Sequence, residues 1–592
     1  MTEENIKITP AKGRPMLNWV GKRPLDYVKG FPAQLVECFD PLNVNKIPQT
    51  PNYESLKDNW HNLLFHGDNK DVLATLLEKG FRGKIDLIYI DPPFKSGADY
   101  VRKVKLRGVK NLNKLDNDDA SILQQTMYFD IWNNDNYLQF MYERLLLLKE
   151  LLSETGSIYV HLDSYIGHYI KILMDEIFGQ GNFRSSIIWN TSVPQVAGFK
   201  WLSNGWIYSQ AMILYYTKSK TNYVFNKQYI EVKQKSGDIS KKPISDIWND
   251  IKNFAGIFGA KDSKTGFQTQ KPEALLERII KASSNPDDIV LDCFIGSGTT
   301  AAVAQKLGRR WIACDLNKGA VQLTSKRLQG IIKNQISDKN GDKQLALLKE
   351  NSLPRYTSFA VYKVNDYDLK ILETEAIELA VQHIGIQRTR TDSFFDGTFG
   401  KELVKIIDFN HPLTLLDLQL IQEELEKRPN EDRNITIVCL GKELSVDPWI
   451  EEWNKKHPIN KLNVIELKTN PKYGSFLIHK PDEAKVRMER TDKTKGKVVI
   501  EDFISPTIIE RLNMDNKLFK IKIPDFRSMI DTVLIDNNYN GKTFHIVYSD
   551  VPEKKDDLIK GEYEIEILEN KTVVAVKIID MLGEEVIITE EI

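Results

Sequence analysis

Two kinds of apolar pattern, near-continuous runs and helical repeats, follow one another along the first half of the chain. Near-continuous apolar runs, typical of strands buried on both faces of a parallel sheet, occur at residues 62–66, 84–91, 157–163, 288–294 and 309–315. Apolar residues three and four positions apart, typical of amphipathic helices, occur at residues 70–80, 136–156, 168–179, 271–284 and 298–308. Strands that alternate with helices in this way predict a doubly wound, Rossmann-like α/β sheet, to which residues 185–190 and 211–218 add two further strands.

The pattern changes after about residue 350, and a chain of 592 residues is too long for one core. Residues 434–441 and 462–468 indicate a smaller α/β unit, and residues 542–549, 562–569 and 572–592 alternate as in a β-rich domain. We expect an irregular arm over 1–60, a catalytic domain over 61–345, an α/β region over 346–490 and a β-rich domain over 491–592, with the lysine-rich residues 490–497 as linker. Polar insertions at about 95–130 and 191–262 interrupt the catalytic domain.

The charge of the chain is almost balanced, with 81 Lys and Arg against 82 Asp and Glu. No global basic field exists, so binding to nucleic acid has to depend on local patches. The four cysteines form no C-x-x-C pair, which argues against a disulfide framework or a zinc site and fits a reducing cytosol. The polar N-terminus and the absence of a long apolar run predict a cytoplasmic protein without a signal peptide or a membrane span.

The strand at residues 84–91 ends in the tetrapeptide Asp91, Pro92, Pro93 and Phe94. Proline cannot donate to a sheet, so the strand has to stop there. A carboxylate at the end of an apolar strand is costly without a partner. The tetrapeptide is therefore either a simple strand end with a turn or a site at which carboxylate and carbonyl acceptors face a cleft.

A second motif, "DCFIGSGTT", lies about 200 residues later, at residues 292–300. Gly296 and Gly298 allow a close approach of backbone to a ligand, and the following helix directs N–H groups toward it. The next strand ends in Asp315, where an acid can accept hydrogen bonds from ribose hydroxyls. This pattern predicts an adenosine-containing cofactor, although a tight strand-to-helix turn would look similar.

Together, the two motifs resemble those of amino-group DNA methyltransferases. Asp-Pro-Pro-Phe resembles their catalytic tetrapeptide, and "DCFIGSGTT" resembles their S-adenosylmethionine loop. The catalytic motif comes first, as in the β class, and "FHGDN" (65–69) and "TGFQTQKPEALLERII" (265–280) match further family elements. With its long C-terminal extension, the chain resembles the modification subunits of type III restriction–modification systems, although those usually carry Tyr and Asn-Thr-Gly where Phe94 and residues 95–97 stand here.

The resemblance implies a site-specific, adenine-specific DNA methyltransferase that uses S-adenosylmethionine, flips its target base and requires no metal. Asp91 and the carbonyl of Pro92 would accept the two hydrogens of the target amine, held by Pro93, while Phe94 stacks on the flipped base. Asp68 would lie near adenine, Asp315 at the ribose and Lys271 at the carboxylate of the cofactor. The remaining cofactor residues would be Asp292, Phe294, Gly296, Gly298 and Thr299.

Double-stranded DNA is the expected partner. The basic run at residues 101–114 is either a solvated face or a loop that holds phosphates; its candidates are Arg102, Lys103, Lys105 and Arg107. Residues 191–262 stand where the class keeps its target-recognition region. We also expect a homodimer and a helicase–nuclease restriction partner. Two alternatives stay open: a cytosine-N4 methyltransferase, and a DNA-recognition subunit of such a restriction complex.

His66 and His161 stand at strand ends, where a lone histidine is more often structural than catalytic. Cys293 and Cys314 lie beside the cofactor motifs and are expected to be packing residues. None of the four therefore enters the predicted site.

Overall fold

The structure is a computed structural model of the 592-residue chain. It describes residues 6–10, 15–19, 21–42, 47, 50–93, 100–107, 122–128, 134–191, 209–233, 239–253, 270–337, 355–364, 377, 381, 384–388, 392, 394–407, 412–443, 445–467, 481–515, 523, 525–552, 557–567 and 571–592. These residues form two compact units, one of residues 1–365 with 482–592 and the other of residues 366–481.

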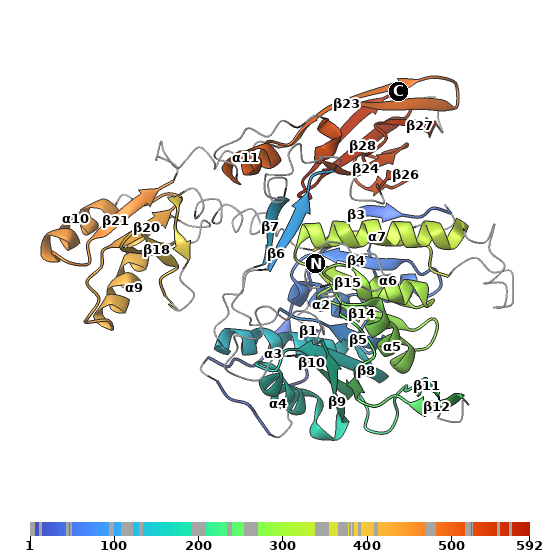
Figure 1. The fold of residues 1–592 in the computed structure, drawn as a ribbon, viewed down its shortest axis with the longest axis horizontal. Coiled ribbons are helices and arrows are strands. Elements are labelled where there is room, and N and C mark those ends of the chain that lie inside the picture. Colours follow the sequence, from blue (N-terminus) through green and yellow to red (C-terminus); the bar gives the residue numbers. More distant parts are fainter. Residues whose placement is uncertain are drawn as a thin grey trace. The chain divides into compact units, whose positions relative to one another are not determined.

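The first unit is organised around one mixed sheet (Figure 1). Its strands are β3 (Ala33–Phe39), β4 (Asn62–His66), β5 (Ile85–Ile90), β8 (Leu152–Leu162), β9 (Phe183–Asn190), β10 (Gln210–Thr217), β13 (Ile247–Trp248), β14 (Ile289–Asp292), β15 (Arg310–Asp315), β16 (Phe359–Val364) and β25 (Phe544–His545). They lie in the order β13-β9-β10-β8-β5-β14-β15-β4-β16-β3-β25. From β8 through β16 all neighbours are parallel, whereas β10 is antiparallel to both β8 and β9.

Helices cover both faces of this sheet. One face packs against α2 (Asn69–Glu78), α3 (Asn134–Leu151) and α4 (Gly167–Phe178). The other packs against α5 (Glu273–Ser283), α6 (Thr299–Lys306) and α7 (Lys318–Ser337). The short helices α1 (Tyr53–Leu56) and η1 (Gln180–Asn182) complete the helices of this region that the structure describes. The expected doubly wound α/β fold is confirmed.

Two parts of the catalytic region differ from the sequence prediction. Residues 152–156 were expected to end a helix, but they begin β8, because Leu152 pairs with Ile85 at the start of β5. The expected irregular arm contains β3, which pairs with β16 and adds to the main sheet. Local periodicity revealed neither β3 nor the first residues of β8, since both are stabilised by a partner distant in sequence.

The polar insertions contain small antiparallel sheets. β6 (Tyr100–Lys105) pairs with β7 (Ile122–Tyr128), and β11 (Tyr229–Lys233) pairs with β12 (Ile239–Pro243). β1 (Ile6–Lys7) and β2 (Tyr27–Val28) form another such pair near the N-terminus. The insertion at 191–262 also supplies β10 and β13 to the main sheet, so part of it is core.

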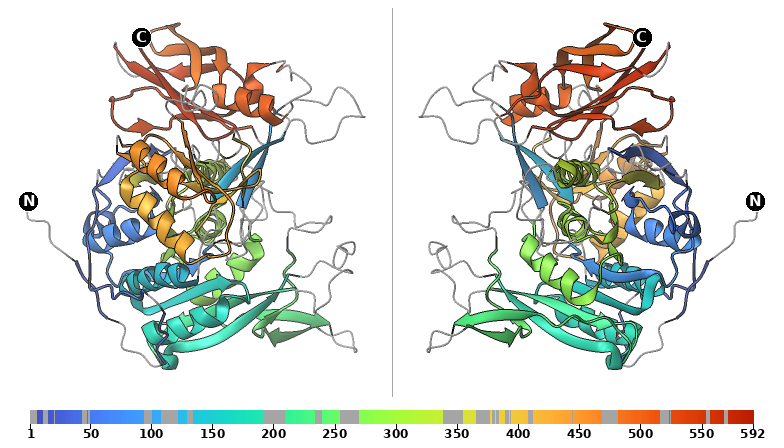
Figure 2. Two further views of the ribbon diagram at one scale, coloured as in Figure 1. Left: turned by 90° about the vertical axis from the view of Figure 1, so that its left-hand side faces the viewer. Right: turned by 90° about the vertical axis from the view of Figure 1, so that its right-hand side faces the viewer.

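The C-terminal residues of the first unit form a β-rich layer (Figure 2). Its elements are β22 (Glu483–Arg490), β23 (Lys495–Ile504), α11 (Pro506–Asp515), η6 (Phe526–Met529), β24 (Ile530–Asp536), β26 (Tyr548–Asp550), β27 (Glu562–Glu566), β28 (Val573–Asp580) and β29 (Glu585–Glu591). They share one apolar core, and β25 from the same segment extends the main sheet beside β3. The β-rich layer is therefore part of the catalytic unit.

The second unit is a small α/β unit. Its sheet contains β17 (Gln387–Arg388), β18 (Gly397–Phe399), β19 (Glu402–Ile406), β20 (Ile435–Cys439) and β21 (Leu462–Glu466), in that order. α9 (Leu415–Glu426) and α10 (Val446–Lys456) pack on one face. The strands expected at residues 434–441 and 462–468 are confirmed.

The boundaries of the C-terminal regions differ from the predicted ones. Residues 490–497, expected to be a linker, join β22 to β23 as the turn of a hairpin, and the compact units divide after residue 481. A lysine-rich turn and a lysine-rich linker share the same composition, and only strand pairing distinguishes them.

Candidate active site

The two sequence motifs meet at the carboxyl ends of β5 and β14. These strands are parallel neighbours, with Leu291 paired to Ile88, so Asp91 and Asp292 lie at the same edge of the sheet. From this point the chain proceeds to β8 on one side and to β15 on the other. Such a switch in direction creates the crevice in which open α/β sheets bind ligands.

Asp91 lies at this edge of the sheet, and only 18% of its side chain is exposed. Its Oδ2 accepts a hydrogen bond from the Lys271 ammonium and forms an ion pair with it. Its Oδ1 is buried and has no hydrogen-bond partner among the residues that the structure describes. Burial raises the pKa of Asp91, and the Lys271 ammonium opposes that shift. The carboxylate therefore retains one buried oxygen that can accept a hydrogen bond.

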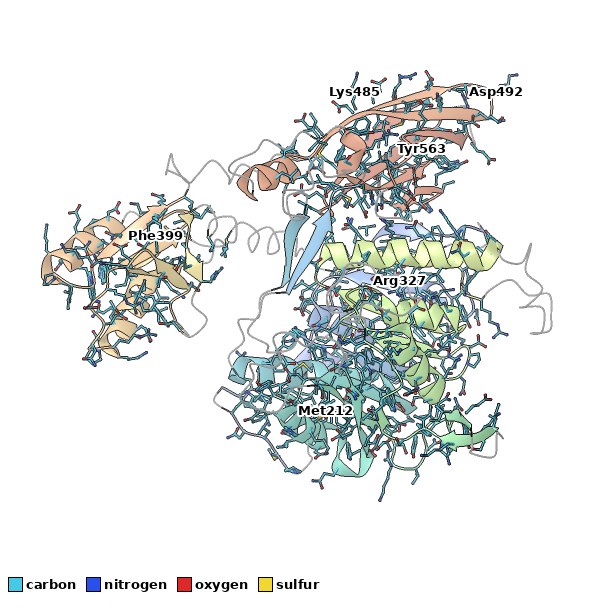
Figure 3. The ribbon with its side chains drawn as sticks, in the orientation of Figure 1. Met212, Arg327, Phe399, Lys485, Asp492 and Tyr563 are labelled. Atoms are coloured by element: carbon cyan, nitrogen blue, oxygen red, sulfur yellow. The ribbon has the colours of Figure 1, made fainter. Side chains whose placement is uncertain are left out.

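The glycine loop after β14 is a tight turn into α6. Gly296 and Gly298 have φ values of +50° and +78°, which favour glycine. A Cβ on Gly298 would lie 2.8 Å from Oγ1 of Thr324 on α7, so the turn also packs too closely for a side chain. Arg327 of α7 (Figure 3) braces the loop by donating to the carbonyl of Ser297 at 3.0 Å and to Thr299 Oγ1 at 3.2 Å.

The acids that flank the loop organise its backbone. Asp315, at the end of β15, accepts N–H bonds from Gly296 and Asn317, each at 2.9 Å. Asp292 accepts from Phe294 N–H at 2.9 Å and from the Thr300 hydroxyl at 2.5 Å. Burial raises the pKa of Asp292 to about 7, with the charges of Asp91 and Asp315 adding to the increase. Asp292 thus shapes the turn from a buried position.

Asp68 lies on the neighbouring loop and has a partner that the sequence reasoning missed. It accepts the N–H of Lys70 at 2.7 Å, which caps α2, and both its oxygens accept from Arg144 at 3.0 and 3.1 Å. The Arg144 guanidinium lies 3.5 Å from the ring centroid of Phe140, which contacts Phe294. Arg144 therefore connects α3 to the Asp68 loop, and Phe140 of the same helix contacts Phe294 beside the glycine loop.

A sequence signal for Arg144 did exist. It lies on α3 three positions after Met141 and four before Leu148, and the structure buries all three. An arginine on the apolar stripe of a helix is costly unless it is paired, so its position predicts a buried acidic partner. The identity of that partner, Asp68, becomes apparent only in the fold.

Lys271, which the resemblance implies at the carboxylate of the cofactor, pairs in the structure with Asp91. His161 follows the residue of β8 that pairs with Ile90 and shares a 2.9 Å hydrogen bond with Tyr89. Burial, with the Lys271 charge added, lowers the pKa of His161 well below its ordinary value, so the ring is neutral. Its role as a buried structural histidine fits the expectation.

The expected DNA-contacting residues fall into three groups. Phe94 lies outside the described residues, as do residues 192–208 of the second insertion. Arg102, Lys103 and Lys105 lie on β6, for which the structure describes the backbone alone.

Arg107 departs from the phosphate-binding role expected for it. Its side chain is 8% exposed and donates to Asp531 of β24 at 2.8 Å, while its N–H donates to Ser528. The neighbouring Leu106 is buried in the core of the β-rich layer. Arg107 thus anchors the loop end of the β6–β7 hairpin to that layer, with its guanidinium engaged by Asp531.

Among the described residues, no group of three or more His, Cys, Asp and Glu side chains is placed to hold a metal ion. Within those same residues, no helix is both long and apolar enough to cross a bilayer.

The fold and the site together define an α/β protein with a glycine turn beside a buried carboxylate at the carboxyl edge of a parallel sheet. A family model described as "DNA methylase" matches residues 85–326. The DNA adenine methyltransferase YhdJ of Escherichia coli is 30% identical over 276 residues, which cover 45% of this chain and 82% of YhdJ. The chain belongs to this DNA methylase family.

Further relatives include longer proteins. The StyLTI Mod subunit, a type III restriction–modification enzyme of Salmonella typhimurium, is 26% identical over 357 residues, covering 44% of this chain and 53% of that subunit. Among solved structures, the M1.HpyAVI–SAM complex is 23% identical, with a TM-score of 0.31, over 45% of this chain and 98% of that one.

Replacing Asp315 by alanine is expected to weaken binding of an adenosine-containing cofactor by roughly 10- to 100-fold, the effect of losing one or two hydrogen bonds to a charged group. The Gly296 and Asn317 amides would lose their acceptor, and the turn would lose its shape. Isothermal titration calorimetry measures the affinity, with the exposed Asp492→Ala as the control. An unchanged affinity in folded Asp315→Ala would contradict a role for this acid in binding.

Proposed function

We propose that the protein is a site-specific DNA methyltransferase that transfers a methyl group from S-adenosylmethionine to the N6 amino group of adenine in double-stranded DNA. The observation that carries the proposal is the buried, unpartnered Oδ1 of Asp91 beside the glycine turn after β14. A hydrogen-bond acceptor at this position can bind a hydrogen of a neutral amine that has to become a nucleophile.

The residues at the glycine turn fit an adenosine-bearing methyl donor. Gly296 and Gly298 allow backbone to approach it, the amino end of α6 faces the turn, and Asp315 offers an acceptor at the end of the second strand. Asp68, Asp292, Phe294 and Thr299 complete the proposed set. When bound, S-adenosylmethionine supplies an electrophilic methyl group.

The chain itself contributes orientation and electrostatics to the reaction. The lone pair of an aromatic amine is delocalised into its ring, so the amine is a weak nucleophile. Asp91 Oδ1 accepts one of its hydrogens and the Pro92 carbonyl accepts the other, which favours a tetrahedral nitrogen and stabilises the positive charge that develops there. Pro93 fixes the direction of the peptide, and Phe94 stacks on a base taken out of the helix.

DNA contacts belong to the proposal as well. Arg102, Lys103 and Lys105 hold phosphates beside the flipped base, and the insertion at 191–262 reads the target sequence. The similarity to a type III Mod subunit supports a restriction–modification setting with a helicase–nuclease partner. A homodimer in the cytoplasm completes the proposal.

Long-read modification mapping tests this function directly. The chain is expressed alone in a host that lacks adenine and cytosine methylation, and plasmid DNA is sequenced. Methylated adenine within one short motif is the expected result, and a vector expressing Asp91→Ala provides the matched control. Methylated cytosine would establish the N4 alternative. Unmodified DNA from cells containing folded, cofactor-binding protein would show that methylation by this chain alone does not occur.

A further inference from the structure

The two oxygens of the Asp91 carboxylate have different environments. Oδ2 receives the Lys271 ammonium, whereas Oδ1 is buried and has no hydrogen-bond partner. The Lys271 side chain is itself only 12% exposed. Both members of the pair are thus largely removed from water. In such a buried site an ion pair orients its partners far more strongly than at a surface.

The backbone next to Lys271 is held in place from several sides. Pro272 follows it as the N-cap of α5, and Glu273 begins the helix. Glu273 accepts from Arg327 of α7 at 2.8 Å and from Lys306 of α6 at 2.6 Å. Because Arg327 also braces the glycine loop, the position of Lys271 is tied to that loop.

Of the described residues near Asp91, the other charged or titratable groups do not stabilise its ionised form. Asp292 of β14 is a like charge, and Tyr89 of β5 is a neutral phenol whose pKa is raised well above its ordinary value by burial and by these two acids. His161 of β8 is neutral for the same reason of burial. Lys271 is therefore the cation that offsets the desolvation of Asp91.

We propose that Lys271 is a positioning residue for the catalytic carboxylate. It keeps Asp91 ionised in a buried site and occupies Oδ2, which leaves Oδ1 as the oxygen that accepts the hydrogen of the target amine. This inference rests on the proposed function and adds to it the residue that sets the working pH range of the reaction. It also replaces the expectation that Lys271 binds the carboxylate of the cofactor.

The pH dependence of single-turnover methyl transfer tests the proposal with Lys271→Gln and Lys271→Arg. The rate needs ionised Asp91, so it falls as the pH drops through the pKa of Asp91. Loss of the ammonium raises that pKa further. The acid limb of the pH–rate profile, meaning the part in which the rate falls with falling pH, is therefore expected to move to higher pH by about 1 unit or more in Lys271→Gln. Lys271→Arg is expected to return the acid limb to the pH at which the unmodified protein shows it. Lys281→Gln, which changes an exposed lysine of α5, provides the control.

Two outcomes would overturn the proposal. A uniform loss of rate with an unmoved acid limb would show that Lys271 acts only on the fold. An unmoved acid limb together with a cofactor affinity reduced more than about 10-fold would show that Lys271 binds the cofactor and does not position Asp91. Cofactor affinity close to that of the unmodified protein, with a shifted limb, is the expected result.

A stability measurement separates this inference from the proposed function, because it needs no activity. Lys271→Gln is expected to lower the thermal unfolding midpoint by an amount that grows as the pH rises from the ordinary pKa of an aspartate to the raised pKa of Asp91 and then levels off, because the unfolded chain releases this proton before the folded protein does. Adding Asp91→Asn to the same chain is expected to restore the midpoint. A double variant no more stable than Lys271→Gln at high pH would exclude the pairing even if the protein methylates no DNA.

Discussion

Replacing Asp91 by alanine is expected to lower the rate of methyl transfer by about 10²- to 10³-fold, the usual effect of removing one acceptor or donor aimed at developing charge. The change removes the buried Oδ1 and the carboxylate with which the Lys271 ammonium forms its ion pair. Affinity for S-adenosylmethionine should remain within a few-fold, because Asp315 and the glycine turn are untouched. Single-turnover transfer of a labelled methyl group to plasmid DNA, together with calorimetry of cofactor binding, measures both quantities.

A matched control lies at the other end of the same strand. Asp86, near the start of β5, accepts the Ile289 N–H at 2.9 Å and the Ser153 hydroxyl at 3.2 Å, and the amide oxygen in Asp86→Asn can keep one of these bonds. Its transfer rate should equal that of the unmodified protein. If Asp91→Ala lost cofactor affinity as strongly as rate, Asp91 would belong to the cofactor site and not to the target amine.

Replacing Lys577 by methionine is expected to lower the free energy of unfolding of the first unit by about 3–5 kcal/mol, the usual cost of leaving a buried charge unpaired. Lys577 on β28 is 5% exposed and donates to Glu37 of β3 at 2.9 Å. The pair joins the β-rich layer to β3 of the main sheet. Chemical denaturation followed by circular dichroism measures the change.

The double variant Glu37→Gln with Lys577→Met provides the control, because it removes both charges of this pair, while Glu585, 3.9 Å from the Lys577 ammonium, keeps its ion pair with Lys318. Its stability should recover most of the loss, as neutral replacements of buried ion pairs often do. A loss below about 1 kcal/mol in Lys577→Met would instead match an exposed surface pair. The β-rich layer would then contribute little to the catalytic unit through this contact.

The β-rich layer also bears on how the catalytic motif is held. Asp531 of β24 accepts from Arg107 at 2.8 Å and from Lys326 of α7 at 3.0 Å. One carboxylate thus joins the insertion that follows the Asp-Pro-Pro motif to the helix that braces the glycine loop. Residues 482–592 belong to the same compact unit as the site, and removing them would expose the core around Leu106.

The sequence by itself determined the α/β class, most of the strands and helices of the catalytic region, and the two motifs that form the site. These features are local. A buried parallel strand needs a continuous apolar run, a helix repeats its apolar face every three or four residues, and a strand has to end at Asp91-Pro92-Pro93 because proline cannot donate. The glycines at positions 296 and 298 likewise indicate a tight turn with positive φ angles, which the neighbouring residues suffice to predict.

Only the tertiary structure decided which distant groups meet. Lys271 lies 180 positions from Asp91, and Arg107 lies 424 positions from Asp531, so no short pattern predicts either pair. The roles of Arg144, of β3 and of the turn at residues 490–497 depended in the same way on partners that the fold supplied. Ion pairs and strand ladders depend on sheet order and on docking of layers, and those are properties of the whole chain, whereas periodicity and turn chemistry are properties of a few neighbouring residues.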